Sequence, residues 1–186
     1  EPVTRERVVK LKLGNEERRR FVPGLEDLID GPITVELSRV DDQRQAAAID
    51  LSSATLTVPW IGWAKGQGIG AKATFEAVES EGQTAIEKFV LDGDGFGAAG
   101  SLVVGKQGLI SADFKRMRLA PADDYSLVVR QSKGGYEVSV SGKSADVRSL
   151  ITELKSGGKG QGEATERSMA LKVKGRLDRV VGFGDE

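Results

Sequence analysis

The feature that most constrains this 186-residue chain is a two-residue alternation of apolar and polar side chains along most of its length. Val9, Leu11 and Leu13, for example, alternate with lysines. Successive side chains of a β-strand point to opposite faces, so this period is typical of half-buried strands. Turn sequences rich in glycine separate such segments at residues 92–95, 105–108 and 133–135. The pattern therefore predicts antiparallel hairpins in series.

The other alternating segments extend this prediction to most of the chain. They cover residues 33–37, 47–51, 54–58, 69–77, 89–91, 96–104, 110–114, 125–129, 136–140 and 169–173. The phase of the alternation changes near Ser52 and Ser53, as a β-bulge would allow. We expect a mainly β protein whose core is an antiparallel β-meander.

Two segments break the strand rhythm, because their apolar residues are spaced by three and four positions. Residues 15–29 and 144–154 are therefore predicted to form two short helices. A polar, glycine-rich stretch follows the second one and is typical of a flexible linker. We divide the chain into a β module with flanking helices (residues 1–155), a linker (156–167), and a strand that begins or completes an adjacent unit (168–186). We also expect the chain to be a segment of a longer polypeptide.

The residue content excludes the commonest catalytic chemistries. The chain has no histidine and no cysteine, so a histidine general base, a serine triad and a thiolate nucleophile are absent. Asp92 and Asp94 resemble the start of a calcium loop, but the closing acidic residue is missing. The net charge of −1 gives no field that would attract nucleic acid. We expect that the chain is not an enzyme and that it has no cofactor, no metal site and no nucleic-acid partner. A hydrolase would need a close pair of carboxylates in an enclosed pocket.

Many side chains on the apolar face of the predicted sheet are small, which leaves room beside it. A sheet of this kind could curl around an open trough that accepts acyl chains, since each CH₂ group removed from water contributes about 0.8 kcal/mol. The residues predicted to contact lipid are Ile49, Leu51, Ala71, Ala73, Phe75, Ala98, Leu102, Ala112 and Phe114. The alternative is a tightly packed sandwich, in which the same alanines allow two sheets or a helix to approach closely.

Two further clusters each allow two interpretations. Trp60 and Trp63 could form an interface with a membrane or a partner protein, or they could close one end of the core. Arg18, Arg19 and Arg20 could hold phosphate headgroups, or they could form a solvated helix face.

The order of motifs resembles that of a known family. AIDLSSATLTVPWIGWAKGQGIGAKATFEA (residues 48–77) is followed by IEKFVLDGDGFGAAGSLVVG (86–105) and ISADFKRMRLAPADDYSLVVR (110–130). This succession is similar to the periplasmic AsmA-like proteins of the YhdP and TamB group. FVPGLEDLIDGPITVEL (residues 21–37) and ADVRSLITEL (145–154) resemble the helices that open and close a unit in that group.

The resemblance implies a strongly curved, antiparallel β-groove with an apolar channel. Members of that group are periplasmic proteins anchored in the inner membrane, and they are implicated in moving phospholipids toward the outer membrane. The implied function is conduction of phospholipid acyl chains along the groove in outer-membrane biogenesis. The implied partners are phospholipid and neighbouring repeats of the same polypeptide, with membrane contact only through the parent protein. The alternative is a non-catalytic structural or protein-interaction module with a filled core.

Overall fold

The computed structural model describes residues 8–17, 28–58, 63–106, 108–148, 152 and 170–182. These residues form thirteen strands and almost no helix. The strands are β1 (Val8–Leu13), β2 (Ile29–Asp30), β3 (Ile33–Arg39), β4 (Arg44–Asp50), β5 (Thr55–Val58), β6 (Trp63–Lys65), β7 (Ala71–Ser80), β8 (Gln83–Gly93), β9 (Phe96–Gly105), β10 (Gly108–Arg118), β11 (Asp124–Ser132), β12 (Gly135–Asp146) and β13 (Ala170–Val181).

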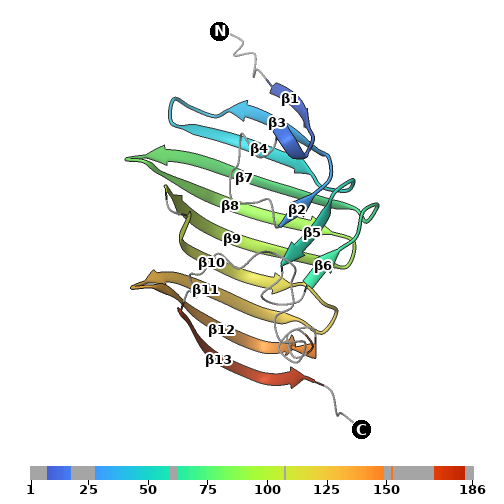
Figure 1. Ribbon diagram of the computed structural model, residues 1–186, viewed down its shortest axis with the longest axis vertical. Coiled ribbons are helices and arrows are strands. Elements are labelled where there is room, and N and C mark those ends of the chain that lie inside the picture. The colour runs from blue at the N-terminus through green and yellow to red at the C-terminus, as the bar shows by residue number, and fades with distance from the viewer. Residues whose placement is uncertain are drawn as a thin grey trace, which may run out of the picture.

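Ten strands form one large sheet in the order β1-β3-β4-β7-β8-β9-β10-β11-β12-β13, and β2, β5 and β6 form a small separate sheet. All neighbours in the large sheet are antiparallel except β12 and β13, which are parallel. Figure 1 shows the strands following one another along the long axis of the molecule, with β1 and β13 at opposite ends. The predicted mainly β, antiparallel meander is confirmed.

The large sheet is open, and it is neither closed nor curled. The predicted curvature into a groove is therefore not found. The small sheet lies in front of the large one at one end of its strands (Figure 1), and residues of both sheets share the core cluster.

Tight hairpin turns connect most neighbouring strands. Gly95, Gly108 and Gly134 adopt positive φ angles in the three turns that the sequence predicted, a conformation that costs glycine little. The phase change near Ser52 and Ser53 is not a bulge, which corrects that prediction. Residues 52–54 form a turn at which the chain leaves the large sheet, and the following strand β5 belongs to the small sheet.

The core lies between the two sheets. Ala71 and Ala73 of β7 are buried there with Leu56 of β5, while Ile29 and Trp63 of the small sheet pack against the same cluster. Full burial of a side chain the size of leucine contributes about 1.5–3 kcal/mol. In this half of the molecule the alanines thus permit close packing of two sheets, as the sandwich alternative predicts.

The predicted helices and linker fall largely outside the described residues. Asn15, Glu16 and Glu17 have helical backbone, and so do Arg148 and Thr152, but the rest of both predicted helices and the linker at 156–167 are not described. Within the predicted final segment, β13 joins the large sheet by pairing in parallel with β12. Whether it begins or completes an adjacent unit stays a prediction.

Candidate functional site

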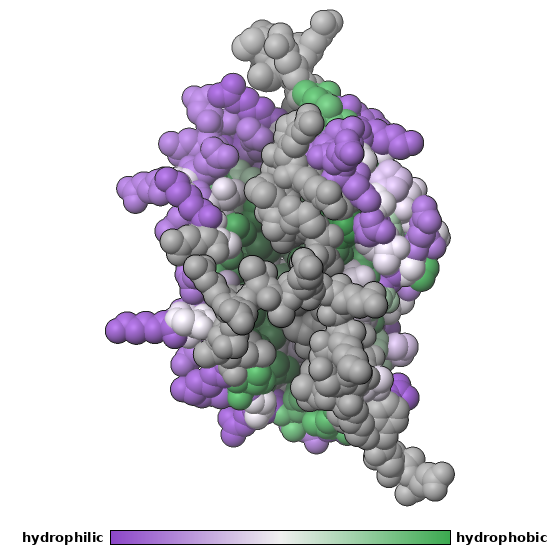
Figure 2. Space-filling model, in the orientation of Figure 1, coloured by the Kyte–Doolittle hydropathy of each residue, from purple (hydrophilic) through white to green (hydrophobic). Residues whose placement is uncertain are grey.

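The two faces of the large sheet differ in character, because the alternation of each strand is kept in register with its neighbours. One row of directly opposite residues on the apolar face consists of Leu11, Val35, Ile49, Ala73, Leu91, Ala98, Met117 and Tyr125. A second row consists of Ala77, Ile86, Leu102, Ala112, Val129, Val138 and Val173. Figure 2 shows hydrophobic residues in the middle of this face and hydrophilic residues along its margins.

All nine residues predicted to contact lipid belong to this apolar face or to the core beneath the small sheet. Leu51, Ala71 and Ala73 are buried in the core cluster, and Ile49 packs against it. Ala98 and Ala112 are buried as well. Phe75, Leu102 and Phe114 are only partly buried. The structure brings the set onto one side of the sheet and leaves Phe75, Leu102 and Phe114 partly accessible.

Three phenylalanines meet in the centre of the apolar face. The ring centroids of Phe75 and Phe89 are 6.5 Å apart in a stacked arrangement, and those of Phe89 and Phe114 are 5.8 Å apart, edge to face. Gly100 of β9 lies directly between Phe89 and Phe114 in the strand register. A glycine at this position has no side chain to separate the two rings.

Register shifts in β8 and β10 place two of these rings. The register of β8 against β9 shifts between Ile86 and Phe89, and Lys88 adopts a left-handed φ of 52° there. The register of β10 against β9 shifts between Phe114 and Arg116. A bulge changes the direction of the side chains that follow it, and left-handed φ costs a residue other than glycine about 1 kcal/mol or more. Phe89 was predicted to lie in a strand with Leu91, but it was not among the predicted lipid contacts.

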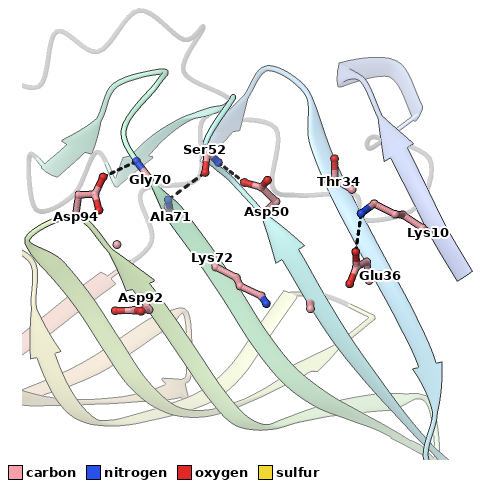
Figure 3. A pocket seen from close by; sticks show the side chains of 12 residues that line it. Lys10, Thr34, Glu36, Asp50, Ser52, Gly70, Ala71, Lys72, Asp92 and Asp94 are labelled. Carbon is pink, nitrogen blue, oxygen red and sulfur yellow. Dashed lines mark hydrogen bonds and ion pairs between the residues drawn. The ribbon is translucent and has the colours of Figure 1, made fainter. Parts of the chain in front are cut away.

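The opposite face is polar and carries two cavities, of about 480 and 430 Å³. In the larger one, Lys10 pairs with Glu36 at 2.7 Å, and the carboxylates of Asp50 and Asp94 accept backbone N–H groups from Ser52 and Gly70 (Figure 3). The hydrogen bond from the Ser52 backbone lowers the pKa of Asp50. These carboxylates hold turns and strands in place and form no enclosed acidic pair.

A charge network joins β4, β7 and β8 on the polar face. The Glu76 carboxylate accepts hydrogen bonds from Lys88 Nζ at 2.6 Å and from Arg44 Nη1 at 2.7 Å. The hydrogen bond from Lys88, and then the one from Arg44, lowers the pKa of Glu76. The folded state therefore holds this carboxylate ionised to lower pH than the unfolded chain does.

Replacing Glu76 with glutamine is expected to weaken the acid dependence of stability. Because the pKa of Glu76 is lower in the folded state, its stabilising contribution is present above its unfolded pKa and is lost as the pH falls through the folded value. The free energy of unfolding of the variant should change less between about pH 5 and pH 3. Urea titrations at several pH values measure this. Glu79→Gln, an exposed site on the same strand, is the control, and equal slopes for both variants would contradict the expectation.

A buried lysine connects the small sheet to the turn after β4. Lys65 of β6 is 1% exposed, and its ammonium group donates to the backbone carbonyls of Leu51 at 2.7 Å and Ala54 at 2.6 Å. Its third, longer bond reaches the Ser52 carbonyl at 3.4 Å. Burial lowers the pKa of Lys65. Sequence reasoning missed this residue, because nothing in the alternation distinguishes it from an exposed strand lysine.

Trp63 connects the small sheet to the far end of β10. Its indole Nε1 donates to the Leu119 carbonyl at 2.9 Å, and its ring meets that of Phe96 edge to face at 5.1 Å. Asp123, which is buried, accepts N–H groups from Leu119, Ala120 and Asp146 and so fixes the same loop. The side chain of Trp63 is thus partly buried and packs against the core. An interface role for it stays a prediction, and Trp60 lies outside the described residues.

The described residues hold no group of three or more His, Cys, Asp or Glu side chains placed to bind a metal ion. Over the same part of the chain, no helix is both long and apolar enough to cross a membrane. The arrangement offers an apolar surface on one face of the sheet and paired charges on the other.

Comparison with models of protein families, with curated proteins and with solved structures finds no match to this chain. The resemblance to AsmA-like proteins therefore stays a prediction.

Proposed function

We propose that this chain is a non-catalytic lipid-binding module that holds acyl chains against the apolar face of its large sheet. The supporting observation is the continuity of that face. The row from Ala77 to Val173 crosses seven neighbouring strands without a polar residue. With strands spaced by about 4.8 Å, this row is roughly 29 Å long, so it could accommodate an extended acyl chain.

The ligand path that we propose runs across the strands, along the long axis of the molecule. The small sheet packs over Leu51, Ala71 and Ala73, so ligand contact is assigned mainly to the partly buried residues beyond it. Phe75, Leu102 and Phe114 belong to the predicted set, and the register adds Leu127, Val129, Val138 and Val140. The polar face, with its paired charges, would remain in water.

The wider role is proposed from the sequence resemblance. We propose that the parent protein is periplasmic and anchored in the inner membrane, and that the module conducts phospholipid toward the outer membrane. In that case, a groove would arise from the apolar face together with neighbouring repeats of the same polypeptide, since the sheet does not curl by itself.

Replacing Leu102 with aspartate is expected to weaken acyl binding at least tenfold. The change removes an apolar contact worth about 1.5–3 kcal/mol and places a carboxylate in the ligand path. Binding is measured by native mass spectrometry after incubation with phosphatidylethanolamine vesicles, and by titration with a fluorescent fatty acid.

Ser101→Asp is the matched control, because Ser101 is exposed on the same strand and points to the opposite face. Circular dichroism must show that both variants are folded. If the wild-type chain acquires no lipid, or if the two variants bind lipid equally well, the proposed function is wrong.

A further inference from the structure

Strand β13 forms one end of the large sheet and offers a long free edge. It pairs with β12 on one side over residues 170–181, and no strand within the described part of the chain pairs with its other side. A free edge presents unpaired backbone N–H and C=O groups that can accept another strand. Val173 and Val180 on this strand are 59% and 50% exposed. The edge thus combines open hydrogen-bonding positions with exposed apolar side chains.

The side chains along β13 carry a regular charge pattern. Lys172, Lys174 and Arg176 occupy successive positions on the polar face, opposite Glu137, Ser139 and Ser141 of β12. Lys172 pairs with Glu137 at 3.3 Å, whereas Lys174 and Arg176 have no ion pair with any described carboxylate. Two cations at the free edge are therefore available to a strand that pairs there.

The same pattern disfavours a second copy of this chain as the occupant. The opposite edge strand, β1, carries Lys10 and Lys12 at alternate positions on the polar face. Pairing β1 of one copy with β13 of another would place lysines beside Lys174 and Arg176. Like charges on directly opposite residues destabilise strand pairing. Two β13 strands would bring together three cations from each copy, with Asp178 as the one acidic position on the polar face of each strand.

We propose that β13 accepts a strand from a partner protein in which acidic and apolar residues alternate. The partner strand would extend the sheet, with its acidic side chains beside Lys174 and Arg176 and its apolar side chains beside Val173. Backbone hydrogen bonds would supply affinity, and the alternation would set the register. Asp178 follows Arg176 on the polar face of β13, and its carboxylate would repel an acidic residue opposite it. We therefore expect the partner strand to have no acidic residue at that position. This edge adjoins the proposed acyl-binding row at Val173, whereas Lys174 and Arg176 lie on the opposite, polar face.

A labelled peptide of alternating glutamate and valine tests this proposal with the full chain. Fluorescence anisotropy should show that it binds about tenfold more tightly than a lysine–valine peptide at low ionic strength, with a preference that weakens as salt increases. Hydrogen exchange should show new protection in residues 170–181. The double variant Lys174→Glu and Arg176→Glu should reverse the preference between the two peptides.

The double variant Lys115→Glu and Arg116→Glu is the control, because these exposed residues lie on the central strand β10. It should keep the wild-type preference. Equal binding of the two peptides, an unchanged preference in the β13 variant, or concentration-dependent dimers of the chain through β13 would each overturn the proposal. If the charge-reversed variant does not fold, the double variant Lys174→Gln and Arg176→Gln replaces it. The proposal is then overturned if the glutamate–valine peptide binds this variant as tightly as it binds the wild-type chain.

Discussion

Replacing Lys65 with methionine is expected to lower the free energy of unfolding by about 3 kcal/mol. The substitution removes the buried ammonium group, so three backbone carbonyls lose their hydrogen-bond donor. Methionine fills a similar volume but donates no hydrogen bond. For a chain of this length, the loss corresponds to a decrease in Tm of roughly 6–12 °C. Urea denaturation and differential scanning calorimetry measure both quantities.

The control for this prediction is Lys72→Met on β7, the next strand along the chain. Lys72 is exposed, and no ion pair to it is found among the described residues, so its replacement should change stability by less than about 0.5 kcal/mol. Similar unfolding midpoints for the two variants would show that the buried hydrogen bonds of Lys65 contribute little. A selective loss in the Lys65 variant would identify the contact that fixes the small sheet to the turn after β4.

Replacing Gly100 with alanine is expected to lower the free energy of unfolding by about 2–3 kcal/mol, because the added Cβ has no space. It would contact the backbone oxygen of Asp113 and lie 2.6 Å from the Cα of Phe114. Both contacts are with backbone atoms of β10, so the two strands would have to separate. The rings of Phe89 and Phe114, which meet over this glycine, would move apart as well.

Gly175→Ala on β13 is the matched control, because no atom beyond the adjacent residues lies within 4 Å of the added Cβ. An alanine in an open strand position restricts the unfolded chain, so this variant should be neutral or stabilised by up to about 1 kcal/mol. Chemical denaturation measures the difference, and near-ultraviolet circular dichroism reports the aromatic packing. Equal stability of the two variants would contradict the close approach of β9 and β10.

The periodicity of the sequence predicted the larger part of the fold, because strand alternation and turn chemistry are local. Gly95, Gly108 and Gly134 mark hairpin turns in the structure and in the sequence alike. The nine predicted contact residues share one side because antiparallel register preserves the alternation from strand to strand. The alternation placed Phe89 in a strand with Leu91, but it did not predict the register shift before Phe89 or the contacts of its ring with Phe75 and Phe114.

Accessibility could not be predicted in the same way, because it depends on which segments pack together. Leu51 and Leu102 were both predicted to contact lipid, yet Leu51 is buried in the core cluster and Leu102 is only partly buried. Lys65 and Lys72 both lie in strands, but Lys65 is buried and donates hydrogen bonds to three backbone carbonyls, whereas Lys72 is exposed. These differences arise from contacts between residues that are distant in the chain.

The sequence by itself determined that the chain is a β-meander with one apolar and one polar face, because the two-residue period and the turn residues act over a few positions. Only the tertiary structure decided that the chain leaves the large sheet after Leu51, that a second sheet covers part of the apolar face, and that β13 pairs in parallel with β12. The physical reason is that sheet pairing and burial are long-range interactions, and the same strand pattern is compatible with several partners.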